Sequence, residues 1–365
     1  MQTSANGLES FYSQLTPRIE ADIPLWYGKG ARLAGPPSFQ PRPWSYFFRY
    51  PVQIVGAQEK AVLVKIRHIE EMSIAEAVQD EKMKGEMREE FMSLEKIRNT
   101  FSKAQDAPLF FAIRHLALYA DLNSLVMEEA DIHTLKSRFQ APPMWVEGSA
   151  RKFFESHLNL AGRWLRVFHS EIGQMIDGDF FDEALYRRAR NQLANISAIS
   201  GVNMNFLQVH LEGLREKYQG QSLPYSTLHD NFSLANVFIT GDKRICSFDP
   251  HNKLGPIYLD LAKLVTDMEA CRTQVLTNDV NVPLSRLISF NAALLHGYFQ
   301  NETVNFSALR LYRLISIIEK WEEYEQKLAD LEGKNRILHF ITATALRNNF
   351  LKLVRLQTQA DYRDE

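Results

Sequence analysis

The segment Ser226-Thr-Leu-His229-Asp230-Asn231-Phe-Ser-Leu-Ala-Asn236-Val-Phe-Ile239, with Ile245-Cys-Ser-Phe-Asp249 shortly after it, decides the fold of this chain. It begins with a short loop that carries His, Asp and Asn. An apolar strand, a Gly-Asp turn and a second apolar strand ending in Asp249 follow. Polar side chains therefore cluster at the ends of two short strands, which interrupt an otherwise helical part of the sequence.

The segments before residue 130 predict a small lobe rich in strands. A helical pattern at Leu8–Glu20 and a Pro- and Gly-rich stretch at Gly28–Pro43 make up most of residues 1–45, which we interpret as an N-terminal extension packed on this lobe. Mixed three- and four-residue spacing of apolar residues predicts one long helix over Ile74–Phe101. The expected strands are Trp44–Tyr50, Val52–Val55, Ala61–Ile66, Phe110–His115 and Ser124–Met127.

The remaining sequence is mostly helical. Amphipathic patterns cover Ala150–His169, Phe180–Ile196 and Asn203–Tyr218, and helices return from Leu259 onward. A chain of 365 residues exceeds what one hydrophobic core usually supports, so two lobes are expected. We predict an α+β fold, with a β-rich N-terminal lobe over residues 46–130 and a larger, mostly helical C-terminal lobe over residues 131–365.

The composition excludes several classes of protein. A formal net charge of −2 gives no field for general nucleic-acid binding. The N-terminus lacks the pattern of a signal peptide, and no window has the roughly 18 apolar residues that a transmembrane helix needs. The two cysteines, Cys246 and Cys271, are too few for a disulfide framework and lack zinc-site spacing. We expect a cytoplasmic protein with no nucleic-acid partner, no transmembrane segment and a buried Cys246, and we leave its oligomeric state open.

Three motifs carry a resemblance to a known family. In order, they are His229-Asp230-Asn231-Phe232-Ser-Leu-Ala-Asn236, Cys246-Ser-Phe-Asp249 and Gly255-Pro256-Ile-Tyr-Leu-Asp260-Leu-Ala262. They resemble the aminoglycoside phosphotransferase and choline kinase-like family, whose corresponding patterns are His-Gly-Asp-Phe-x-x-x-Asn, Ile-Asp-Phe-Asp and Gly-Pro-x-x-x-Asp-Leu-Ala. The resemblance extends from about Trp44 to Leu264 and implies the bilobal protein-kinase-like fold.

The resemblance implies ATP and Mg²⁺ as cofactors. In phosphoryl transfer the protein mainly positions groups and neutralises the charge on the phosphates. Asp249 would be the chief magnesium ligand, because a hard cation prefers carboxylate oxygen, and Asn236 would add an amide oxygen. Lys65 ends an apolar strand at the family's position for the lysine that contacts the α- and β-phosphates. Its expected partner is Glu90 in the following helix. The alternatives are Glu86, Glu89 and Glu95.

Other residues are placed by the same resemblance. The stretch Ser124-Leu-Val-Met127-Glu128-Glu129 resembles the interlobe segment whose backbone groups bind adenine, so Met127, Glu128 and Glu129 are candidate nucleotide-binding residues. The helix that ends at His169 is similar to the family's Leu-x-x-x-His helix. We expect His169 to be a packed residue, and we expect His229 and Asp260 to shape the loop by hydrogen bonds.

One position departs from the family pattern. The family's catalytic Asp lies five residues before the metal-binding Asn, and that position holds Asn231, with Asp230 one place earlier. A carboxylate can accept the proton of an acceptor hydroxyl, whereas an amide can only orient that hydroxyl. We therefore take Asp230 and Asn231 together as the candidate catalytic residues, and a small adjustment of the loop would be needed for Asp230 to act as the base.

The sequence leads to two functional hypotheses. The first is a phosphotransferase that uses ATP and Mg²⁺ and transfers the γ-phosphate to an alcohol group of a small polar metabolite or sugar-like acceptor. The second is a pseudokinase-like nucleotide-binding or interaction module with weak or no transfer activity. An acidic run at Glu319, Glu322, Glu323 and Glu325 is either a face that attracts a cationic acceptor or, as is more common, a solvated helix surface.

Overall fold

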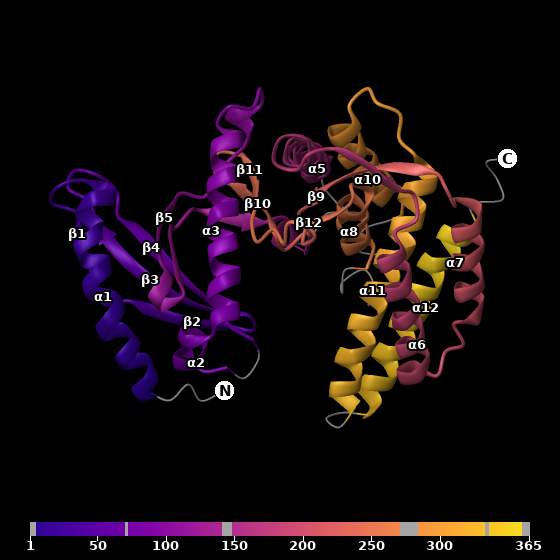
Figure 1. Cartoon of the computed structure of the whole chain (residues 1–365), viewed down its shortest axis with the longest axis horizontal. Coiled ribbons are helices and arrows are strands. Elements are labelled where there is room, and N and C mark those ends of the chain that lie inside the picture. Colours follow the sequence, from indigo (N-terminus) through magenta and orange to yellow (C-terminus); the bar gives the residue numbers. More distant parts are fainter. Residues whose placement is uncertain (1–4, 70–71, 141–147, 271–283, 333–335, 360–365) are drawn as a thin grey trace. The chain divides into compact units, whose positions relative to one another are not determined.

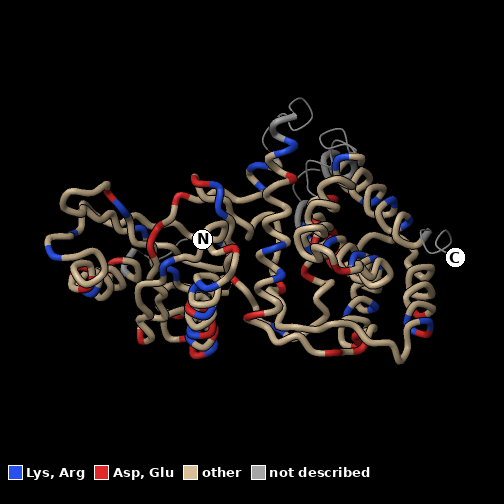
Figure 2. Tube along the Cα trace, turned by 90° about the horizontal axis from the view of Figure 1, so that it is seen from above, with Lys and Arg blue, Asp and Glu red and all other residues tan. Residues whose placement is uncertain are grey.

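The computed structural model describes residues 5–69, 72–140, 148–270, 284–332 and 336–359 (Figure 1). The chain divides into two compact units. The N-terminal unit consists of Met1–Ala107 and Phe111–Asp131, and the C-terminal unit consists of Pro108–Phe110 and Ile132–Glu365. Strands dominate the first unit and helices dominate the second, which is the α+β organisation predicted from the sequence. Basic and acidic residues are interspersed along both units, in line with the small net charge (Figure 2).

The N-terminal unit is built on one antiparallel sheet. Its strands follow the order β1-β3-β4-β6-β5, and β2 pairs with β3. The strands are β1 (Arg32–Leu33), β2 (Ser38–Arg42), β3 (Ser45–Gln53), β4 (Lys60–Arg67), β5 (His115–Tyr119) and β6 (Ser124–Glu128). The two strands predicted at Trp44–Tyr50 and Val52–Val55 are a single strand, β3, because Pro51 keeps its place in the ladder opposite Ala61.

One predicted strand is wrong in position. The apolar run Phe110–His115 is mostly loop, and β5 begins only at its last residue. Phe110 and Ile113 are buried, so the apolar residues of this run belong to the core although they do not pair as a strand. Phe110, which belongs to the C-terminal unit, forms an isolated parallel bridge with Ile245 of that same unit instead.

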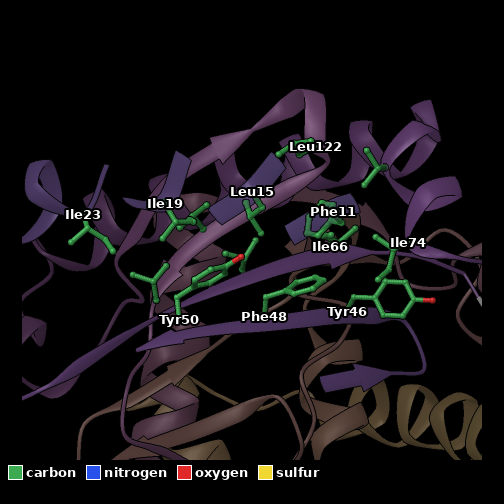
Figure 3. Packing of buried hydrophobic residues seen from close by; sticks show 14 of the residues in the cluster. Phe11, Leu15, Ile19, Ile23, Tyr46, Phe48, Tyr50, Ile66, Ile74 and Leu122 are labelled. Carbon is green, nitrogen blue, oxygen red and sulfur yellow. The ribbon is translucent and has the colours of Figure 1, made fainter. Parts of the chain in front are cut away.

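Helix α1 (Ala5–Tyr27) covers one face of the sheet. It is longer than the predicted Leu8–Glu20, although Pro17 and Pro24 lie inside it. Its apolar residues recur at helical spacing and pack against the buried aromatic residues of β3 (Figure 3). The buried residues of α1 are Phe11, Leu15, Ile19 and Ile23, and those of β3 include Tyr46, Phe48 and Tyr50. The helix is thus a full layer of the N-terminal unit.

The opposite face of the sheet carries α3 (Glu81–Phe101), as Figure 1 shows. The predicted helix Ile74–Phe101 is in fact two helices, α2 (Ile74–Gln79) and α3. Asp80 separates them in an extended conformation, and its carboxylate accepts a hydrogen bond from Met83 N, which caps α3. Since side chains alternate along a strand, Lys65 of β4 points to the α3 side while Val64 and Ile66 belong to the core under α1.

The C-terminal unit surrounds two small antiparallel sheets with helices. One sheet has the order β11-β10-β7 and the other β12-β9-β8. The strands are β7 (Ile132–Thr134), β8 (Ile176–Asp179), β9 (Ser222–Leu228), β10 (Val237–Thr240), β11 (Ile245–Ser247) and β12 (Lys253–Pro256). The helices are α4 (Leu135–Gln140), α5 (Gly148–Val167), α6 (Glu183–Ser200), α7 (Asn205–Lys217), α8 (Tyr258–Glu269), α10 (Leu284–Phe299), α11 (Phe306–Glu332) and α12 (Arg336–Gln359).

Cys246 is a buried free thiol on β11, as predicted, whereas Cys271 lies outside the described residues. Within the described part of the chain, no helix is both long and apolar enough to cross a membrane.

Candidate functional site

A buried ion pair joins β4 to α3 in the N-terminal unit. Lys65 Nζ lies 2.7 Å from Glu90 Oε1 and 2.9 Å from Glu90 Oε2, and both side chains are buried. Of the four glutamates considered for this contact, Glu86 accepts a hydrogen bond from Arg67 instead. Burying two charges has a large desolvation cost, so the pair contributes little net stability. What it provides is an ammonium group held in one place on a rigid strand.

The segment considered for adenine binding lies at the end of β6. Glu128 N donates to Arg114 O, and Glu129 N donates to Ala61 O, so both amides are engaged within the sheet. Adenine recognition by this segment would therefore depend on its carbonyl groups or on N–H groups beyond Glu129. Met127 is buried within the same strand.

The acidic side chains at the end of β6 have structural contacts of their own. Glu128 contacts Lys60 and Arg114, and Glu129 contacts Arg49. Burial acts to raise the pKa of Glu128, but the charges and hydrogen bonds of Lys60 and Arg114 outweigh it and keep that pKa below its usual range. These carboxylates therefore tie neighbouring strands of the sheet together.

In the C-terminal unit, Asp260 of α8 holds the loop that follows β9. Its two carboxylate oxygens accept from His229 N (2.7 Å) and Asp230 N (2.8 Å). His169 Nε2 lies 3.0 Å from Asp260 Oδ2, and His169 Nδ1 lies 2.8 Å from the hydroxyl of Tyr298. Burial opposes ionisation of Asp260, yet contact with His169 keeps the pKa of Asp260 lowered. His169 and Asp260 therefore pack and shape the loop, as expected.

His229 is fully buried beneath the loop. Its Nε2 lies 2.8 Å from the hydroxyl of Ser247, and its backbone carbonyl accepts from His251 N. Burial lowers the pKa of His229 to about 4, because an imidazolium in this environment would lose its hydration. His229 is therefore neutral near pH 7 and connects the loop to β11.

The carboxylate of Asp230 forms ion pairs with neighbouring cationic side chains. Its Oδ1 lies 2.5 Å from Lys263 Nζ, its Oδ2 lies 2.6 Å from Lys253 Nζ, and His251 Nδ1 lies 3.6 Å from the same Oδ2. Burial alone would raise the pKa of Asp230, but the contacts with His251, Lys263 and Lys253 hold it far below its usual range. A carboxylate with so low a pKa is a weak proton acceptor.

Asn231, Asn236 and Asp249 form a connected group. Asn231 Nδ2 donates to Asp249 Oδ2 at 3.3 Å, and Asn236 Nδ2 donates to the carbonyl of Asn231 at 3.0 Å. Asn236 O in turn accepts from the hydroxyl of Ser247 and from Phe248 N, two residues that lead to Asp249. The three side chains predicted from the sequence are thus brought together by direct hydrogen bonds.

The donor set of this group suits a magnesium ion. Asp249 offers a carboxylate, and Asn236 keeps its amide oxygen because its NH₂ group serves Asn231. Mg²⁺ is commonly held by one or two such protein oxygens together with substrate phosphates and water. Among the described residues, no group of three or more His, Cys, Asp or Glu side chains could hold a metal by itself.

Two lysines that the sequence motifs did not predict, Lys253 and Lys263, contact Asp230 directly. Lys263 carried a usable signal, because it lies three residues after Asp260 in a predicted helix and therefore on the same face. Lys253 carried none, since its contact depends on how β12 pairs with β9.

The acidic run on α11 is not a single open face. Glu325 is fully buried and is held by Trp321 and by Arg347, whereas Glu323 contacts Lys320 and Lys327. Glu319 lies 3.5 Å from Arg188, and Glu322 accepts from Asn195. Helix packing has therefore given these four carboxylates separate partners, and neither of the two interpretations offered above describes the run as a whole.

Comparison with solved structures identifies the fold. No protein-family model and no curated protein sequence matches the chain. A choline/ethanolamine kinase family protein from Mesorhizobium loti is similar over 96% of this chain and 99% of its own, with 14% identity and a TM-score of 0.53.

Two further solved structures are similar in fold at similarly low sequence identity. A glucosamine kinase in complex with glucosamine, ADP and inorganic phosphate is 12% identical over 90% of this chain and 83% of its own, with a TM-score of 0.54. An ethanolamine kinase from Plasmodium vivax is 12% identical over 95% of this chain and 86% of its own, with a TM-score of 0.50. The chain therefore has the bilobal, protein-kinase-like α+β fold of the choline kinase-like proteins, as the sequence motifs predicted.

Proposed function

We propose that this protein is a phosphotransferase that uses ATP and Mg²⁺ and transfers the γ-phosphate to a hydroxyl of a small polar metabolite or sugar-like acceptor. The fold supports this proposal, because similar structures are choline/ethanolamine and glucosamine kinases. Fold alone does not specify activity, which is set by individual side chains of the site.

The hydrogen-bonded group Asn236–Asn231–Asp249, in which Asn231 contacts both other residues, carries the proposal. It places one carboxylate and one amide oxygen at the ends of two adjacent strands, which is the ligand chemistry that a phosphate-bound Mg²⁺ requires. In the proposal, Asp249 and Asn236 would hold the metal, which would supply positive charge next to the phosphates. Lys65, fixed by Glu90, adds a positive charge for the α- and β-phosphates. Met127, Glu128 and Glu129 contribute the adenine-binding segment.

The acceptor hydroxyl would be oriented rather than deprotonated. Asn231 can donate or accept a hydrogen bond but cannot take up a proton. Asp230 keeps its negative charge paired with Lys253 and Lys263, which makes it a poor base. General-base catalysis typically contributes about 10²–10⁴ in rate, so the proposal includes slow turnover relative to a kinase that has this base.

Transfer of label from [γ-³²P]ATP to a panel of amino alcohols, amino sugars, sugars and other polyols tests the proposal. The expected result is a labelled product that needs Mg²⁺ and is absent with Asp249→Asn. Lys243→Met is a suitable control, since Lys243 lies in the turn between β10 and β11, away from the proposed ligands. Absence of both ATP turnover and transfer over the whole panel would overturn the proposal.

The second candidate is a pseudokinase-like module that binds nucleotide and acts through partners. The observation that favours it is the ion pairing of Asp230, which leaves the loop without an available base. Thermal-shift measurements with ATP, ADP and Mg²⁺ separate the two candidates when they are combined with the transfer assay. Stabilisation by nucleotide without turnover supports the module, and turnover rules out an inactive protein.

A further inference from the structure

The loop from His229 to Leu234 is hydrogen-bonded to residues on a single face of α8. Asp260, Lys263 and Asp267 are spaced three and four residues apart, so they lie on one side of that helix. Asp260 accepts from His229 N and Asp230 N, Lys263 donates to the loop, and Asp267 accepts from Leu234 N at 3.0 Å. Acidic residues of the helix therefore accept hydrogen bonds from the loop at both of its ends, and a lysine of the same helix donates to the loop between them.

Lys263 makes a contact that the two acids cannot make. Its Nζ donates to the backbone carbonyl of Asp230 at 2.8 Å as well as to Oδ1 of the same residue at 2.5 Å. That carbonyl belongs to the peptide unit that joins Asp230 to Asn231. A hydrogen bond to this carbonyl restrains the plane of the peptide from which Asn231 begins.

The backbone at Asp230 needs such support. Asp230 has a φ of 58°, in the left-handed region that favours glycine, although Asp tolerates it better than most residues. Its N–H is held by Asp260 and its carbonyl by Lys263, so contacts from one helix hold both sides of this residue. Strained backbone persists where the surrounding structure over-determines it.

The peptide on the other side of Asn231 is held as well. The carbonyl of Asn231 accepts from Asn236 Nδ2 at 3.0 Å, and the side chain of Asn231 donates to Asp249 Oδ2 at 3.3 Å. Asn231 itself is thus held by the two proposed metal ligands, and Lys263 holds the carbonyl of the residue before it. Groups outside a ligand set commonly orient the ligands and tune affinity in this way.

We propose that Lys263 is a positioning residue of this loop, which acts through Asp230 to hold the Asn231 amide against Asp249 and thereby sets the affinity of the proposed metal site. The inference deepens the proposed function, because it depends on Asp249 and Asn236 binding a divalent cation. Lys263 contacts neither the metal nor the nucleotide in this proposal.

Lys253 provides a matched control. It contacts the same carboxylate, at Oδ2, without a hydrogen bond to the backbone carbonyl, and its side chain is 63% exposed compared with 17% for Lys263. Lys253→Met and Lys263→Met each remove one positive charge next to Asp230. Only Lys263→Met also releases the peptide that leads to Asn231.

Two measurements on the full chain test the inference. Mn²⁺ affinity is followed by the electron paramagnetic resonance signal of free Mn²⁺, and backbone hydrogen exchange is followed over residues 229–236. Lys263→Met is expected to weaken Mn²⁺ binding about tenfold and to speed exchange in the loop, because the held peptide becomes mobile. Lys253→Met is expected to change both by less than about threefold, and Lys263→Arg, which can bridge carbonyl and carboxylate, is expected to restore both.

The outcomes separate this inference from the proposed function. Equal effects of Lys253→Met and Lys263→Met, or no effect of either, would overturn the role of Lys263. If the unaltered protein binds no Mn²⁺, the proposed metal site is refuted, and so is the control of its affinity by Lys263. Hydrogen exchange over residues 229–236 then decides whether Lys263 positions Asn231. If Lys263→Met does not fold, Lys263→Gln takes its place and is judged by the same two comparisons.

Discussion

Asn231 donates a hydrogen bond from its side-chain amide to the carboxylate of Asp249, with 3.3 Å between Nδ2 and Oδ2. The residue in the family's base position and the proposed metal ligand are therefore in direct contact. An amide in this position supports a single negative charge at Asp249, whereas a carboxylate would oppose it. The choice of residue at 231 thus affects both the proton chemistry and the metal site.

Asn231→Asp is expected to make the protein depend on divalent cations. Without metal, two carboxylates within hydrogen-bonding distance repel each other, and thermal stability should fall by several degrees. With Mg²⁺ or Mn²⁺ the added charge strengthens binding, and the loss of stability should disappear. Differential scanning fluorimetry with and without metal measures this change. Asn231→Ser adds no charge and serves as the control, so a similar metal response in both variants would contradict the expectation.

The double variant Asp230→Gly, Asn231→Asp tests whether the order of these two residues limits activity. It restores a carboxylate at the base position and removes the acid that pairs with Lys253 and Lys263. If the missing base limits turnover, phosphoryl transfer should rise by at least about tenfold, within the usual range of about 10²–10⁴ for a general base. No gain in a folded double variant would mean that the position of the acid is not what limits activity.

Breaking the Lys65–Glu90 pair is expected to destabilise the N-terminal unit. Lys65→Met removes the closer partner of the buried Glu90 and leaves Arg67, whose Nη2 lies 3.4 Å from Glu90 Oε2, so the cost in the free energy of unfolding is expected to lie below the roughly 3–5 kcal/mol of an unpaired buried charge. Lys65→Met combined with Glu90→Leu removes both charges and should recover much of that loss. Lys60→Met is the control, because its pair with Glu128 is 44% exposed on the lysine side and is worth at most about 1 kcal/mol. Urea denaturation of the unaltered protein and of the three variants gives the four free energies of unfolding to be compared.

Ile19→Ala should show that the first helix belongs to the core of the N-terminal unit. Ile19 is fully buried against the sheet, so the substitution is expected to cost about 2–4 kcal/mol through lost burial and an unfilled cavity. Leu25→Ala on the same helix is the control, because Leu25 is 79% exposed. Equal stability of the two variants in urea denaturation would show that the helix does not contribute to this core.

Stability is expected to fall as the pH is lowered from 6.5 to about 4, in part because of His229. The pKa of His229 is lowered to about 4 in the folded chain, so in this window the unfolded chain binds a proton that the folded chain does not. Stability from this group is complete above pH 6.5, and the loss is on the order of 3 kcal/mol at pH 4. His229→Gln should flatten this dependence in urea denaturation series, whereas the same change at the exposed His133 should not.

The principal elements of the fold could be predicted because their signals are local. The apolar run at Ala61–Ile66 and the helical spacing at Ala150–His169 are properties of neighbouring residues, and both elements are present in the structure. Elements with ambiguous local signals were misplaced. The run Phe110–His115 is buried without forming a strand, and a capping residue, Asp80, divides a continuous helical pattern in two.

The candidate site shows the same division between local and distant information. Motif spacing identified Asn231, Asn236 and Asp249, because residues of one strand–turn–strand unit are brought together by that unit itself. The same motif contains Asp230, but the charge state of its carboxylate depends on Lys253, which is brought next to it by the pairing of β12 with β9. The residues around Asp230 in the sequence do not predict that pairing.

The amino-acid sequence by itself determined the α+β architecture, the order of the motifs and the residues proposed as oxygen donors. The tertiary structure decided that Glu90 is the partner of Lys65, that Glu325 is buried, and that the carboxylate of Asp230 is bound by two lysines. The physical reason is that hydrophobic periodicity and turn chemistry act over a few residues. The ionic partners of a side chain instead depend on which distant segments pack against it, and a carboxylate bound in this way by lysines is no longer free to accept a proton.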